Sequence, residues 1–101
     1  MAYSIRTVAG SHEVELAGSF KASDNAVVHE LNDIFKQACG DRCVLVMEGL
    51  KSVDFQGLEI LILLSDMAQS RGVTLTLRRP RGQVKDMLGL TGIDKIIPIE
   101  T

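Results

Sequence analysis

The stretch Cys43-Val44-Leu45-Val46-Met47 is an apolar run in which polar and apolar side chains do not alternate. Such a run is typical of a strand covered on both faces, as in a parallel sheet with helices packed against it. Segments with helical periodicity flank it on either side, at short distances along the chain. We therefore predict that this stretch forms the centre of a sheet.

A hairpin and a helix are predicted before this run. Residues 3–8 and 13–16 alternate between apolar and polar side chains, and residues 9–12 separate them as a turn. Residues 26–35 then carry apolar side chains at helical spacing. The serine and aspartate at 23–24 are expected to cap this helix.

Further elements are predicted after the run. Residues 48–56 are interpreted as a loop, and a helix follows over 57–72. The remaining pattern predicts a strand at 73–77, a short helix at 83–88 and a last strand at 96–99. The proline in the last strand cannot donate a ladder hydrogen bond, which places that strand at an edge of the sheet.

The predicted order of elements is ββαβαβαβ, and the chain contains no linker, repeat or low-complexity tract. Strands that alternate with helices over short connections indicate an α/β fold. The order predicts a mostly parallel, mixed five-stranded sheet with helices packed on it. We predict a single domain over residues 1–101.

Composition and charge exclude several classes of function. The chain has 101 residues, 46% hydrophobic and 24% charged, which suits one soluble domain. Thirteen acidic and eleven basic residues give a net charge of −2, whereas a nucleic-acid binder normally carries a basic excess. No apolar stretch approaches the roughly 20 residues that span a bilayer, and residues 1–6 lack the features of a signal peptide. We expect a cytoplasmic protein that binds no nucleic acid and does not insert into a membrane.

The sequence indicates neither metal binding nor catalysis. Cys39 and Cys43 have no histidine at metal-ligand spacing, and we expect two reduced thiols or, as the alternative, a disulfide between them. His12 is expected in the predicted turn and His29 on a helix surface, each without a positioned partner. The chain shows no nucleophile paired with a base and no cofactor motif. We therefore expect a protein that is not an enzyme and uses no metal or cofactor.

The predicted helix at 57–72 carries more apolar surface than one core face needs. Its apolar side chains span an arc of roughly 260°, against about 100° for an ordinary amphipathic helix. Ile60, Leu63 and Met67 border the polar stripe and are candidates for an outward flank. Two explanations stay open: neighbouring helices cover the flanks, or part of the arc meets another protein.

Residues 44–72 combine a buried strand, the loop SVDFQGL at 52–58 and an apolar helix. With the closing run at 84–97, this order resembles the STAS domain over nearly the whole chain. That family includes bacterial anti-sigma factor antagonists, stressosome proteins, the cytoplasmic tail of sulfate transporters and a small subunit of phospholipid-trafficking ABC transporters. The resemblance implies a non-catalytic protein-interaction module. Typical antagonists continue into a final helix, which this chain is expected to lack.

In the family, the loop before this helix typically reads Asp-Ser-Ser-Gly or Asp-Thr-Ser-Gly, and its first hydroxyl is phosphorylated in antagonists. Aligning Asp54 and Gly57 with that motif puts Phe55 at the phosphoacceptor position. Phenylalanine has no oxygen to accept a phosphoryl group, so the resemblance implies an antagonist without the usual switch. Where the family tends to carry an acidic residue after the second strand, this chain has Lys21. Ser52 is the alternative hydroxyl for a modification.

The resemblance implies a docking surface at the loop and the head of the apolar helix. Phe55 is the expected contact, and the alternative is that its ring packs on Phe20 or on the third helix. The alternative for Asp54 is that it only caps the helix. The expected partner-binding residues are Ser19, Lys21, Asp54, Phe55, Gln56, Gly57, Leu58, Ile60, Leu63 and Met67.

Two kinds of protein partner are implied by the resemblance. One is an anti-sigma factor, a serine-kinase-like ATPase, and the other is the ATPase subunit of a transporter. A homodimer is also compatible with the apolar helix. A further hypothesis is nucleotide binding, because Arg78, Arg79, Arg81 and Lys85 form a basic cluster that could bind an anion. No phosphate-binding loop accompanies the cluster, and a solvated basic turn is the alternative.

Overall fold

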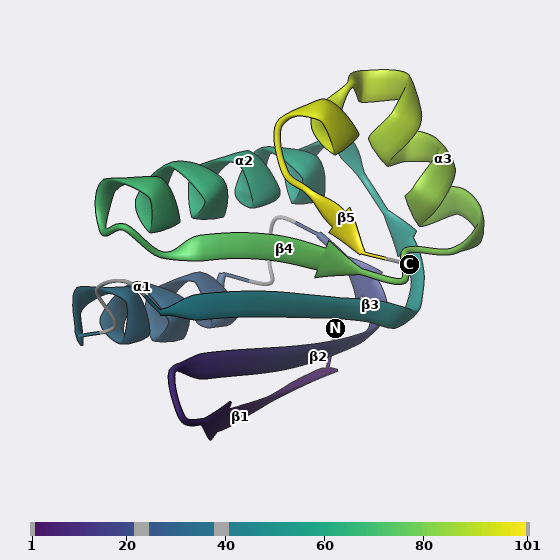
Figure 1. Cartoon of the computed structure of the whole chain (residues 1–101). Coiled ribbons are helices and arrows are strands. Elements are labelled where there is room, and N and C mark those ends of the chain that lie inside the picture. Colours follow the sequence, from purple (N-terminus) through teal and green to yellow (C-terminus); the bar gives the residue numbers. More distant parts are fainter. Residues whose placement is uncertain (1, 22–24, 38–40, 101) are drawn as a thin grey trace.

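The computed structural model describes residues 2–21, 25–37 and 41–100, and Figure 1 labels its helices and strands. The elements in chain order are β1 (Ala2–Val8), β2 (Ser11–Phe20), α1 (Ala26–Gln37), β3 (Arg42–Val53), α2 (Phe55–Ser70), β4 (Thr74–Arg78), α3 (Gly82–Thr91), a 3-10 helix (Ile93–Lys95) and β5 (Ile99–Glu100). This order confirms the predicted α/β arrangement. The predicted cap at 23–24 lies outside the described residues.

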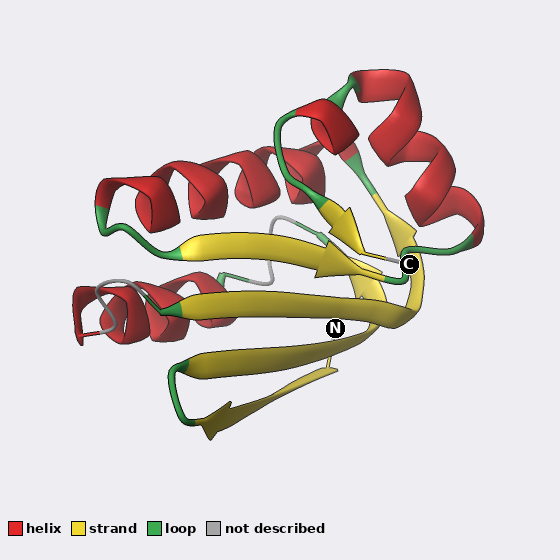
Figure 2. Cartoon of the chain, in the orientation of Figure 1, coloured by secondary structure: helices red, strands yellow, loops and turns green. Residues whose placement is uncertain are grey.

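The strands form one mixed five-stranded sheet in the order β1-β2-β3-β4-β5, with β3 at its centre as predicted. β1 pairs with β2 antiparallel, and the other neighbours are parallel. Each parallel connection passes through a helix and steps in the same direction along the sheet. Because such crossovers are right-handed, successive helices fall on the same face. Figure 2 shows α1 and α2 running along that face.

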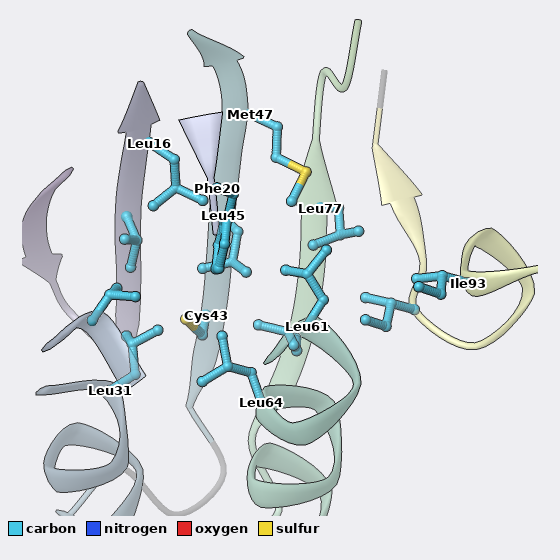
Figure 3. Packing of buried hydrophobic residues seen from close by; sticks show 14 of the residues in the cluster. Leu16, Phe20, Leu31, Cys43, Leu45, Met47, Leu61, Leu64, Leu77 and Ile93 are labelled. Carbon is cyan, nitrogen blue, oxygen red and sulfur yellow. The ribbon is translucent and has the colours of Figure 1, made fainter. Parts of the chain in front are cut away.

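The hydrophobic core lies between this face of the sheet and the helices. Alternate residues of each strand point toward the helices, so apolar side chains of both layers meet there. Figure 3 shows this packing, with labelled side chains that include Leu16, Leu31, Leu45, Met47, Leu61 and Leu64. Burial of a leucine side chain contributes about 1.5–3 kcal/mol, so this layer is the main source of stability.

The opposite face of β3 is covered by long charged side chains. Val44 points to this face, yet it is only 1% exposed. Arg78 of β4 reaches across β3 and donates to Glu13 of β2 at 2.7 Å, and it donates to Glu100 of β5 at 3.0 Å. Arg6 of β1 pairs with the same Glu13. The sequence predicts that both faces of β3 are covered. On this second face the cover is the ion-pair network of Arg6, Glu13, Arg78 and Glu100, and not a second layer of helices.

β3 continues through most of the stretch that the sequence predicts as a loop at 48–56. Its second half pairs with residues 17–20 of β2, after shifts in register. A Cβ atom on Gly49 would lie 2.9 Å from the carbonyl oxygen of Leu16, so glycine permits this close approach. The loop prediction was wrong because pairing with a strand distant in sequence extends β3.

Two boundaries at the edges of the sheet also differ from the prediction. The hairpin turn is only Ala9 and Gly10, whose φ angles of 39° and 81° fit a turn with both central residues left-handed. His12 therefore lies in β2 and not in the turn. At the other edge, β5 begins at Ile99, because the N–H groups of Ile96 and Ile97 donate back to the Ile93 carbonyl oxygen of a 3-10 helix.

Candidate functional site

Asp54 and Gly57 fix the head of α2 against the end of β2. Asp54 is the N-cap residue, and its Oδ1 accepts a hydrogen bond from the Gly57 N–H at 2.7 Å. A Cβ atom on Gly57 would lie 2.6 Å from the Phe20 carbonyl oxygen, so only glycine fits this contact without displacement. The capping interpretation of Asp54 is thereby confirmed. α2 begins at Phe55, two residues before the predicted start.

Phe55 is the first residue of α2, and its ring faces solvent. It is 71% exposed, whereas Phe20 is 1% exposed within the core. The alternative in which the two rings pack together is therefore wrong. An exposed aromatic residue on a capped helix end presents a large apolar surface in a fixed position. Gln56 beside it is also exposed.

Two serine hydroxyl groups near the head of α2 form a hydrogen bond with each other. Ser19 and Ser52 are opposite residues in the β2–β3 pairing, and the Ser52 Oγ donates to the Ser19 Oγ at 2.8 Å. Both residues are half-buried. Lys21 follows the end of β2 and is exposed. The structure thus brings the predicted residues of β2 to the same end of the sheet as the head of α2.

Gln83 is a positioning residue that the sequence analysis missed. Its side-chain amide makes two hydrogen bonds with the backbone of Val53, accepting from the N–H at 2.9 Å and donating to the carbonyl oxygen at 3.1 Å. The side chain thereby joins the first turn of α3 to the last residue of β3, directly before Asp54. Its position after Gly82 was the only signal in the sequence, and glutamine is common on helix surfaces.

The apolar arc of α2 is only partly covered. Leu58 is buried in the core, and Ile60 and Met67 are half-buried against it. Of the predicted outward flank, Leu63 alone is widely exposed, at 48%, and Ile62 joins it at 37%. Ile60 and Met67 expose only part of their side chains, because α2 packs beside α1 and β4.

A shallow groove runs between α1 and α2 on the outer surface. It encloses about 460 Å³. Its lining residues are Asn25, Val28, His29, Gln56, Glu59, Ile60 and Leu63. His29 is exposed on α1, as predicted. The groove adjoins Phe55, because Gln56 lines it and follows Phe55 in the chain.

The basic cluster is split by its ion pairs. Arg78 belongs to the ion-pair network, while Arg79 and Arg81 approach Glu48 at 3.3 Å and 3.6 Å. Lys85 is exposed on α3 and lines a hollow of about 350 Å³ with Arg79, Arg81 and Glu48. An anion in this hollow would compete with a carboxylate that is already present. The arrangement therefore favours the solvated basic turn over a nucleotide site.

His12 connects the hairpin to the start of β3. It is 7% exposed, its Nδ1 lies 2.9 Å from the Thr7 Oγ1, and its Nε2 lies 3.0 Å from the Asp41 Oδ2. These contacts hold the hairpin against the segment that leads into β3. Within the described ranges, no group of three or more metal-ligating side chains is found.

Cys43 lies on the core side of β3 and is 0% exposed. Burial raises the pKa of its thiol to about 12, so the thiolate form is disfavoured. The predicted alternative of a disulfide involves Cys39, which is outside the described residues. In the part of the chain that is described, no helix has the length and apolar character to cross a membrane.

The chain resembles solved structures along its whole length. A putative anti-sigma factor antagonist from Thermotoga maritima superimposes with a TM-score of 0.85 at 18% identity, covering 98% of this chain and 86% of the other. The antagonist SpoIIAA in its unphosphorylated form gives a TM-score of 0.77 at 16% identity, covering 99% and 89%. These likenesses establish a shared fold.

A transporter carries the same fold as part of a larger chain. The murine anion transporter Slc26a9 matches 89% of this chain and 15% of its own, with a TM-score of 0.67 at 20% identity. No curated protein matches the sequence significantly. A family model described as "Mlab, STAS domain" matches residues 4–98. The chain therefore belongs to the STAS domain family.

Proposed function

We propose that this STAS domain is a non-catalytic docking module of the anti-sigma factor antagonist type. It binds a protein partner through a docking surface made of Phe55, Gln56, Leu63 and the groove between α1 and α2. The observation that carries the proposal is the 71% exposure of Phe55 on a helix head that Asp54 and Gly57 hold in place. Large aromatic residues in such positions often contribute about 2 kcal/mol or more to a protein interface.

The docking surface would act without the usual phosphorylation switch. In the motif that this loop resembles, the phosphoacceptor position is occupied by Phe55, which has no hydroxyl group. The Ser52 hydroxyl, the alternative acceptor, donates to Ser19 and is half-buried. Control through the amount of the protein replaces control through phosphorylation in this proposal.

The partner proposed first is a serine-kinase-like ATPase of the anti-sigma factor class, in the cytoplasm. The likeness to antagonist structures supports this choice. Binding should not require ATP hydrolysis, because the docking surface has no group to be phosphorylated. A second candidate partner is the ATPase subunit of a transporter, and the STAS fold within an anion transporter favours it.

The test is affinity purification of the tagged protein from its host, with three forms compared. The wild-type chain and Leu90→Asp should recover the same ATPase, while Phe55→Asp should lose it. Leu90 is the matched control, because it is an apolar residue of α3 with 83% exposure. Equal recovery by the Phe55→Asp form, or recovery of no ATPase by any form, would overturn the proposal.

The identity of the ATPase then separates the two candidates. A serine-kinase-like anti-sigma factor would support the first. Recovery of transporter subunits would support the second. Each form should be checked by circular dichroism before purification, so that loss of binding is not confused with loss of folding.

A further inference from the structure

The outer edge of β1 carries backbone groups that point away from the sheet. β1 is the edge strand, and its pairing with β2 closes at Val8 opposite Ser11, next to the two-residue turn. In an antiparallel pair, hydrogen-bonded and non-hydrogen-bonded pairs of opposite residues alternate, and the pair that flanks a two-residue turn is hydrogen-bonded. Val8 and Ser11 are that pair, so every second residue of β1, counting back from Thr7, does not bond to β2. The N–H and C=O groups of Tyr3, Ile5 and Thr7 therefore face outward.

This edge lacks most of the features that usually prevent strands from pairing, and Arg6 is its one charged side chain. β1 has seven residues, it contains no proline, and its register with β2 is regular throughout. β5, at the other edge, has only two residues and follows Pro98. Within residues 2–100 as described, the two edges thus differ in length and protection, and β1 offers the longer template for another strand.

We propose that β1 pairs with β1 of a second copy of this chain, antiparallel and about a two-fold axis at Ile5. The pairing joins the two sheets into one continuous sheet. This interface is at the opposite edge of the sheet from β5 and does not use Phe55, so it is independent of the proposed docking surface.

The backbone pattern selects this axis. With Ile5 opposite Ile5, Tyr3 lies opposite Thr7 of the second copy, so every outward-facing residue meets another outward-facing residue. An axis at Ser4 also pairs outward-facing residues, but it sets Thr7 opposite residue 1, which lies outside the described strand. Among the described residues the Ile5 axis therefore pairs more backbone groups, and buried backbone groups in proteins are nearly always paired.

The side chains are compatible with the same axis. Tyr3 and Ile5 lie on the core side of β1, half-buried, and the Tyr3 hydroxyl donates to Glu30 of α1 at 3.0 Å. Pairing would place Ile5 beside Ile5 of the second copy and Tyr3 beside Thr7. On the other side of the strand, Arg6 would lie next to Ser4 of the second copy, whose neighbour across β2 is the exposed Glu15. Arg6 of one copy and Glu15 of the other would then lie two strands apart on the same side of the joined sheet, where their opposite charges attract at low salt.

The experiment is sedimentation equilibrium of the full chain over a wide range of concentrations. The wild-type chain should approach twice its 11.0 kDa mass as the concentration rises. Ile5→Pro removes an outward N–H that the β1–β2 pairing does not use, and it should raise the dimer dissociation constant by about tenfold or more. Ile5→Val keeps the N–H and should dimerise like the wild type.

A second variant and a second measurement test the dimer even if the Ile5→Pro form does not fold. Glu15→Arg changes an exposed residue and should weaken the dimer at low salt more than at high salt. In the wild type, amide hydrogen exchange at Tyr3, Ile5 and Thr7 should slow as the dimer forms. A chain that stays monomeric at millimolar concentration, or a dimer that a folded Ile5→Pro form leaves unchanged, would overturn the proposal.

Discussion

At the scale of single residues, Gly57 shows why one position of the loop motif must be glycine. Its Cα lies so close to the end of β2 that a Cβ atom would lie 2.6 Å from the Phe20 carbonyl oxygen and 2.8 Å from the Val53 Cγ2. A backbone oxygen cannot move aside as the end of a flexible side chain can. Any larger residue therefore pushes the head of α2, with Phe55, away from the sheet.

Gly57→Ala should lower the free energy of unfolding by about 1–3 kcal/mol, as overpacking of a tight contact usually does. Gly89→Ala is the control, because its Cβ would lie 3.9 Å from the nearest atom, the Asp94 Oδ2. That change in α3 should be neutral or stabilise by up to about 1 kcal/mol. Urea unfolding of both variants gives the comparison. Equal stabilities of the two would contradict the close contact.

Some residues could be placed from the sequence and others could not. Asp54 was correctly read as a possible helix cap, because capping depends on local chemistry. The sequence alone does not decide whether Phe55 is exposed, because an apolar side chain by itself favours burial. His12 was misplaced, because the turn is shorter than the polar stretch around it. Its contact with Asp41 joins positions that no local pattern connects.

At the scale of elements, Gln83 holds α3 against the end of β3, next to the head of α2. The side-chain amide pairs with the backbone N–H and C=O of Val53 as a neighbouring strand would. The last residue of β3 thus pairs with β2 on one side and with a side chain of α3 on the other. The apolar contacts of Val84 and Leu88 then bury the inner side of α3.

Gln83→Ala should destabilise the fold by about 1–3 kcal/mol, because it leaves two backbone groups of Val53 without their partners. Lys85→Ala, an exposed change on the same helix, should stay within about 0.5 kcal/mol of the wild type. Thermal or urea unfolding measures both. If the Gln83 variant matched the Lys85 variant, the amide pair would have no role in stability.

The order and type of the elements were predictable, because helical and alternating patterns persist over many residues. The centre of the sheet at 43–47 and the helix of residues 57–72 were read from such patterns and are confirmed in kind. The length of β3 was not predictable. It depends on β2 continuing past a shift in register and on Gly49 fitting against Leu16. Neither condition is visible in a local window of sequence.

At the scale of the whole molecule, the sheet has two unlike faces. Helices and apolar side chains cover one face, and the ion-pair network crosses the other from β1 to β5. Its central acid is Glu13, and the guanidinium groups of Arg6 and Arg78 lower the pKa of this carboxyl below its ordinary value of 4.5. The network is therefore a source of pH-dependent stability.

The sign of the effect follows from the lowered pKa. The unfolded chain binds a proton on Glu13 more readily than the folded chain does, so the stabilisation is present above about pH 4.5 and is lost as pH falls through the lower, folded pKa. Glu13→Gln should flatten this part of the pH curve. Glu59→Gln removes the same charge from an exposed position on α2 and is the control.

Chemical denaturation measured from neutral pH down to below pH 4 gives the curves for the wild type and both variants. The wild type and Glu59→Gln should lose stability together on acidification, and the Glu13→Gln curve should fall less. Parallel curves for all three would show that the network does not contribute in this way.

The ion-pair network over Val44 also has a consequence for aggregation at high protein concentration. A sheet with one bare apolar face invites another sheet to stack on it, which is the first step toward fibrils. Here a stacking partner would have to strip water from four charges of alternating sign before it reached the valine. The charged side chains thus act as gatekeepers, and they let a small domain with helices along one face of its sheet remain dispersed when it is abundant.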